Sequence, residues 1–159
     1  MQRFRIRLWL AAGIAGAIEF WLFQVLTGPS TIPQFMGQQI VAQGGYSKAL
    51  TIPIGWGVHL GVSLSYSLLF AILVLIPLSR SEGVRIFVGL VIAAVLGWVA
   101  TLLTAPAITA TISVLSGKGF PAGLPGLNTA YGLPFWNHEL FFGVVWFIYL
   151  FIPYLSRKS

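Results

Sequence analysis

The chain has 159 residues, of which 57% are hydrophobic and only 8% are charged, and its mean hydropathy is +0.90. This balance excludes a soluble globular domain and predicts an integral membrane protein. Cysteine is absent, which excludes disulfides, thiolate nucleophiles, Cys-ligated zinc and iron–sulfur clusters within this chain.

Four apolar stretches can each cross a bilayer, because a helical span takes roughly 20 residues. The first follows a basic start, but it is too long for the apolar part of a signal peptide, so an uncleaved span is expected. The predicted spans are residues 6–26, 54–78, 84–105 and 135–155. The expected fold class is an all-α, integral membrane four-helix bundle, with a single transmembrane domain over residues 1–159 and two long outer loops.

The basic residues are distributed unequally between the two sides of this bundle. Seven of the nine lie near the termini or the short link between the second and third spans: Arg3, Arg5, Arg7, Arg80, Arg85, Arg157 and Lys158. The long loops, residues 27–53 and 106–134, hold only Lys48 and Lys118. Because Lys and Arg are retained on the cytoplasmic side, both termini are expected in the cytoplasm, with the spans in a bacterial inner membrane. The net charge of +6 reflects this topology and the lipid headgroups, and nucleic acid is not an expected partner.

Both outer loops show signs of structure. In the first, apolar side chains recur on one face of a short predicted helix: Ile32, Phe35, Met36 and Ile40. This pattern predicts a segment that lies in the membrane interface. The third span is expected to stop at Pro106, with residues 107–115 as a possible second short helix. Residues 116–132 are rich in Gly and Pro and are expected to form an irregular cap over the mouth of the bundle.

The ionisable residues inside the spans are the first candidates for a functional site. His59 lies 21 residues before Arg80 and His138 lies 19 residues before Arg157, so both imidazoles are expected roughly 30 Å from the cytoplasmic boundary, at one level near the outer surface. Glu139 is next to His138. Glu19 lies 12 residues after Arg7, or roughly 18 Å from the inner side, which places it near the midplane. A carboxyl group at that depth should face the bundle interior and be protonated, paired or hydrated.

Polar and small residues predict which helix faces point inward. Ser63, Tyr66 and Ser67 follow His59 on one face of the second span and form a polar stripe. Small residues recur at intervals suited to close helix packing: Ala12, Ala15 and Gly16 beside Glu19, and Gly89, Ala93 and Gly97 in the third span. The bundle interior is therefore expected to be narrow and polar near its outer end.

Several kinds of site fit this arrangement. His59 and His138 are the candidate axial ligands of a b-type haem held between two helices. A metal ion bound by His59, His138 and Glu139 is a second possibility, and a quinone pocket in which His and Glu handle protons is a third. In the simplest alternative, both imidazoles bond Ser, Thr, Asn or loop carbonyls, while Asn137 and Glu139 reach the outer aqueous layer.

The overall pattern also resembles a known kind of protein. A Gly-rich first span, a second span that reads "GWGVHLGVSLSYSLL" over residues 55–69, and a last span with an early His resemble the small four-helix bacterial inner-membrane proteins of the YagU-like kind. The resemblance covers most of the chain and implies the four-span topology rather than a chemistry. The "NHE" of residues 137–139 departs from the simpler Gly-His pattern of that kind, so no role is transferred to Glu139.

No catalytic motif or soluble domain is present, so the chain is expected to have no catalytic activity of its own. The leading expectation is a small accessory or structural subunit of a larger membrane complex that handles electrons or a membrane substrate, with the lipid bilayer and other membrane subunits as partners. One alternative is a redox protein that uses His59 and His138. Another is a proton-coupled carrier in which Glu19 is the coupling group and the polar stripe of Ser63, Tyr66 and Ser67 supports it.

Overall fold

The computed structural model describes residues 5–75 and 81–156, and these residues contain no strand. The helices in chain order are α1 (Ile6–Thr27), α2 (Ile32–Gly44), the 3₁₀ turn η1 (Lys48–Leu50), α3 (Thr51–Leu73), α4 (Glu82–Leu115), α5 (Leu133–Trp146), the π-helical segment η2 (Phe147–Phe151) and α6 (Ile152–Leu155). Four stretches are long and apolar enough to cross a membrane: Ile6–Thr27, Lys48–Leu73, Glu82–Leu115 and Leu133–Leu155. The predicted all-helical fold with four candidate spans is confirmed.

α1 is the central helix of the bundle, since it packs on both α3 and α5. Small residues let both neighbours come close. A Cβ atom at Gly13 would lie 2.8 Å from Cδ2 of Leu64, and one at Gly16 would lie 2.6 Å from Cε2 of Phe141. Close backbone approach of this kind holds membrane helices together by van der Waals packing. Gly16, part of the predicted small-residue strip, is thus a packing position.

α4 packs on α5 through the second predicted strip. Gly89, Ala93 and Gly97 are all buried. A Cβ atom at Gly97 would lie 2.7 Å from Oε1 of Glu139, and one at Gly89 would overlap Cδ1 of Leu150. The glycines therefore let α5 and η2 come close to α4, as the spacing of the small residues predicts.

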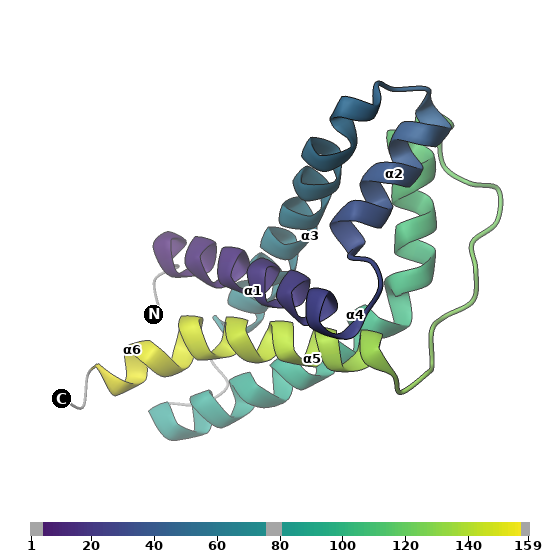
Figure 1. Ribbon diagram of the computed structural model, residues 1–159. Coiled ribbons are helices and arrows are strands. Elements are labelled where there is room, and N and C mark those ends of the chain that lie inside the picture. Colours follow the sequence, from purple (N-terminus) through teal and green to yellow (C-terminus); the bar gives the residue numbers. More distant parts are fainter. Residues whose placement is uncertain (1–4, 76–80, 157–159) are drawn as a thin grey trace.

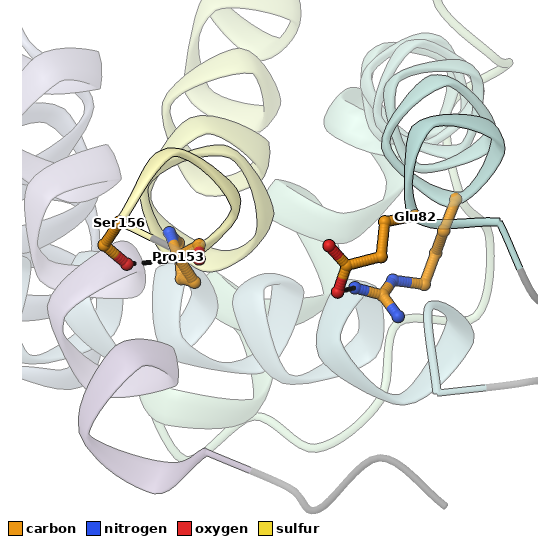
Figure 2. Close-up of polar contacts among 4 residues, drawn as sticks. Glu82, Pro153 and Ser156 are labelled. Carbon is orange, nitrogen blue, oxygen red and sulfur yellow. Dashed lines mark hydrogen bonds and ion pairs between the residues drawn. The ribbon is translucent and has the colours of Figure 1, made fainter. Parts of the chain in front are cut away.

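The start of α1, the start of α4 and α6 lie at the same end of the bundle (Figure 1). Figure 2 shows polar contacts at this end. The hydroxyl group of Ser156 donates to the carbonyl oxygen of Pro153 at 3.1 Å, and Glu82 pairs with Arg85 at 3.7 Å. Because this ion pair is partly exposed to solvent, it contributes little to stability.

α2 has clear start and stop signals. The hydroxyl oxygen of Thr31 accepts a hydrogen bond from the backbone N–H of Gln34 at 3.4 Å, and Pro33 occupies the first turn. Gly45 ends the helix with a φ of 67°, a left-handed conformation that glycine adopts without strain. The side chain of Gln24 accepts a hydrogen bond from the N–H of Ile32 at 2.7 Å, so the start of α2 is fixed to the end of α1.

The predicted position of α2 along the membrane interface stays a prediction. Its apolar face packs against protein, because Met36 and Ile40 form a buried cluster with Ile112 of α4. Only Phe35 of the predicted apolar face is exposed. We call α2, the start of α3 and the part of α4 after Pro106 the α2 lobe. Figure 1 shows these three segments side by side beyond the end of α1.

The closest helix contact in the lobe is between α2 and α3. A Cβ atom at Gly37 would overlap the carbonyl oxygen of Thr51, and a Cβ atom at Gly55 would overlap the carbonyl oxygen of Pro33. The two contacts are reciprocal, because each glycine faces the backbone of the other helix. Only glycine at both positions permits this approach.

The sequence predicts that the third span stops at Pro106, but α4 continues to Leu115. Figure 1 shows that the helix bends, so that its second part belongs to the α2 lobe. Proline removes a backbone N–H and clashes with the carbonyl four residues earlier, which is the usual cause of such a bend. That carbonyl belongs to Leu102, and it accepts a hydrogen bond from the N–H of Asn128 at 3.0 Å. The loop between α4 and α5 thus pairs with the group that the proline leaves free.

The last predicted span is a continuous helical run but not a regular α-helix. It passes from α5 through η2 to α6. Pro153 is the second residue after η2. In a regular α-helix its ring would clash with the carbonyl four residues earlier. A wider π turn just before the proline accommodates it.

Some predicted features lie outside the described residues. These are the end of the second span at residues 76–78 and the basic residues Arg3, Arg80, Arg157 and Lys158. The charge asymmetry, and with it the orientation in the membrane, stays a prediction from the sequence.

Candidate functional site

A cavity of about 260 Å³ lies where α1 ends and α5 begins. The cavity forms because α3 and α4 pack little on each other. α3 packs mainly on α1 and α2, and α4 packs mainly on α5. Each of the helices α1 to α5 contributes to its wall. Most of the wall is apolar, with a few polar side chains, which is the usual composition of a small-molecule site.

His59 lines this cavity from α3 and connects α3 to α1. The side chain is only 6% exposed. Its Nε2 lies 2.9 Å from the carbonyl oxygen of Ala17, and because a carbonyl can only accept, Nε2 carries the proton. The other nitrogen, Nδ1, is then an acceptor. The ring also packs against Phe20 and Trp56, with centroid distances of 5.6 Å to each.

His138 lines the cavity from α5 and is 7% exposed. Its Nδ1 donates to the carbonyl oxygen of Pro134 at 2.7 Å, and the hydroxyl oxygen of Thr101 lies 3.4 Å from the same nitrogen. Thr101 directs its own proton to the carbonyl of Gly97 at 2.9 Å. The tautomer of His138 is therefore fixed as well, and its Nε2 is the acceptor.

The two imidazoles share a level, as predicted, because both pack against the ring of Phe20. The centroid distances are 5.6 Å for His59 and 5.1 Å for His138. A haem ligated by both imidazoles would have to displace Phe20, so the residues present do not fit a shared macrocycle. The described residues also contain no group of three His, Cys, Asp or Glu close enough to hold a metal ion. His59, His138 and Glu139 are therefore not a three-ligand set.

Asn137 is a cavity residue that the predicted site omits. In the simplest alternative from the sequence it reaches the outer aqueous layer, but its side chain is 2% exposed and lines the cavity. Its Oδ1 is buried and has no hydrogen-bond partner among the described residues. A buried amide oxygen without a partner is destabilising by about 1–3 kcal/mol, so a ligand that supplies a donor has a clear role there.

The predicted polar stripe of α3 is divided between two roles. Ser63 and Tyr66 line the cavity. Ser67 is completely buried and donates to the carbonyl of Trp9 at 3.1 Å, while the indole N–H of Trp9 donates to the carbonyl of Leu64 at 3.0 Å. Ser67 is therefore a packing residue between α1 and α3 and not part of the site.

The predicted difference in depth between His59 and Glu19 is wrong. His59 bonds Ala17, which is two residues from Glu19 on α1, so the two side chains share one level. The reason is that α3 ends at Leu73, and the count from His59 to Arg80 extends beyond this helix. Glu19 Oε2 is buried without a partner among the described residues, but Glu19 is not part of the cavity wall.

The cavity wall contains no Lys, Arg, Asp or Glu among the described residues. Glu139 is half-buried against Gly97 on another side of α5. The site can therefore bind through apolar contacts and neutral hydrogen bonds, but it offers no charge to an ionic ligand. No family model, curated protein or solved structure matches this chain, so the likeness to YagU-like proteins stays a prediction.

Proposed function

We propose that this protein is a membrane-embedded binding protein that holds a small, uncharged and largely apolar molecule in the cavity between α1 and α5. The observation that carries this proposal is the buried, unpartnered Oδ1 of Asn137, a residue in the wall of a mostly apolar cavity. An apolar cavity needs no such group for stability, whereas a binding site needs a few polar groups to orient its ligand. The quinone pocket is the predicted site that agrees best with this wall.

The proposed location is a bacterial inner membrane, with both termini in the cytoplasm and the α2 lobe on the outer side. α4 has 34 residues, or about 51 Å at 1.5 Å per residue, which exceeds the roughly 30 Å of a hydrocarbon core. The part of α4 after Pro106 therefore extends toward the headgroups.

The orientation is tested with single cysteines, which the chain lacks. A cysteine at the exposed Ala49 or Gly123 should react with an impermeant maleimide added outside intact cells, and a cysteine at Gly83 should react only after lysis. The reverse pattern would place the α2 lobe in the cytoplasm.

The three functions predicted from the sequence agree with this proposal to different degrees. A binding protein that presents a membrane-soluble molecule to neighbouring subunits is compatible with a role as an accessory subunit. A haem protein is less well supported, because Phe20 contacts both imidazoles. A carrier that couples through Glu19 is also less well supported, because Glu19 lies outside the cavity wall.

The proposal predicts that filling the cavity removes a bound molecule. Ala107 lines the cavity from α4, so Ala107→Phe introduces a ring into it. We expect the purified variant to carry about tenfold less of one apolar compound than the wild type, measured by solvent extraction and mass spectrometry, because overfilled space excludes a ligand.

The matched control is Ala94→Phe. Ala94 is exposed on the same helix and away from the cavity, so its variant should keep the bound compound. Equal amounts in both variants, or no compound other than detergent in the wild type, would contradict the proposed function.

A further inference from the structure

Four polar groups around the cavity offer hydrogen-bond acceptors, while the amide groups of Gln24 and Asn137 also carry N–H donors. Each imidazole donates one N–H to a backbone carbonyl, which leaves Nδ1 of His59 and Nε2 of His138 with a lone pair. Thr104 also lines the cavity, and its proton is directed to the carbonyl of Ala100 at 2.8 Å. The amide oxygen of Asn137 is the fourth acceptor. Only hydroxyl groups that can rotate, such as those of Ser63 and Tyr66, can adapt to either role.

These acceptors converge from neighbouring positions of the bundle. Asn137 and His138 are adjacent on α5, and the ring of Phe20 contacts both imidazoles. The side chains of His59, Asn137 and His138 are each more than nine-tenths buried. A ligand that supplies donors would pair the acceptors of these three side chains.

We infer that the ligand of this cavity is a neutral apolar molecule whose polar end is a hydroxyl group that donates its proton to Oδ1 of Asn137 or to Nε2 of His138. The inference rests on the proposed function and narrows its ligand class. A carboxylate or phosphate is disfavoured, because it would meet acceptors and no cation. A quinone carbonyl has no proton to donate to these two acceptors, whereas its reduced form, a quinol, presents two hydroxyl groups. A long-chain alcohol offers the same donor from a lipid source.

The test compares probes that differ only at the polar end. The full-length protein in mild detergent is titrated with 4-octylphenol, 4-octylanisole and octylbenzene, and binding is followed by tryptophan fluorescence. We expect the phenol to bind about tenfold more tightly than both others, because only the phenol has an O–H for the buried acceptors. A separate titration with 1-dodecanol distinguishes a quinol from a lipid alcohol as the ligand. Stronger binding of the phenol indicates a quinol, and stronger binding of dodecanol indicates a lipid alcohol.

The residue assignment is tested with Asn137→Leu. Leucine has a similar size but no acceptor, so this variant should lose the preference for the phenol while it still binds octylbenzene. Asn128→Leu is the control, because the side chain of Asn128 accepts from the N–H of Ala130 in the loop. A variant that merely disturbed the fold would weaken all three probes equally and lower the melting temperature.

Two failures are distinguishable. If octylbenzene and the anisole bind as tightly as the phenol, and Ala107→Phe weakens all three, the hydroxyl inference is overturned and the proposed function stands. If no probe binds and extraction yields no compound that depends on Ala107, the proposed function itself is wrong.

Discussion

Replacing Gly55 with alanine is expected to separate α2 from α3 and to lower the free energy of unfolding by about 3 kcal/mol. The added methyl group would overlap the carbonyl oxygen of Pro33. Neither partner is a flexible side chain, so the strain is relieved only if one helix moves. Because α2 forms part of the cavity wall through Ile32 and Met36, this movement should also abolish ligand binding. Gly37→Ala should have the same effect, since Gly37 faces the carbonyl of Thr51.

The control lies two residues away on the same helix. Gly57 is exposed, and a Cβ atom there meets nothing within 4 Å. Gly57→Ala should therefore be neutral or stabilising by up to about 1 kcal/mol, because alanine favours the helix. The measurement is unfolding by dodecyl sulfate in mixed micelles, followed by tryptophan fluorescence. Equal stability of the Gly55 and Gly57 variants would show that α2 does not pack as described.

His59→Ala is the second substitution with a large expected effect, a loss of about 3 kcal/mol in the free energy of unfolding. The change removes a buried ring that packs on Phe20 and Trp56, and it removes the hydrogen bond to Ala17. His59→Phe separates these contributions. It keeps the ring but not the donor, so its expected cost is about 1 kcal/mol.

The same titration with dodecyl sulfate measures both variants. Ser65→Ala is a suitable reference, since Ser65 is exposed on α3 and bonds only the carbonyl of Gly61 at 2.8 Å. If His59→Ala were as stable as this reference, His59 would not connect α3 to α1, and its tautomer would no longer be fixed.

The sequence predicts the spans well because the bilayer imposes a strong pattern on apolar length. It also predicts the packing faces at Gly16, Gly89 and Gly97, because only small residues let helices approach. It does not predict where α2 packs, since an amphipathic face fits a lipid surface and a protein groove equally well. Residues 107–115 are predicted as a separate short helix, and their continuity with α4 across Pro106 is missed for a related reason. A proline ends most helices, unless a distant group satisfies the free carbonyl.

The site is predicted in part. His59 and His138 are indeed at one level of the bundle, and Ser63 and Tyr66 do line the cavity with them. The carbonyl partner of His59, Ala17, lies 42 residues away, and no spacing rule indicates it. Asn137 is missed because a polar residue at a helix start is usually solvated. Here the end of α1 and the α2 lobe enclose that start, and this enclosure depends on contacts between helices.

The hydrogen bond from Asn128 to Leu102 has a consequence for biogenesis. Leu102 and Pro106 are synthesised before Asn128, so the bend of α4 precedes the donor for this carbonyl along the chain. The bend in α4 can form first, because it needs only Pro106. Its hydrogen bonding becomes complete only when the chain turns back toward α5. The folding of the loop between α4 and α5 is therefore the step that finishes the preceding helix.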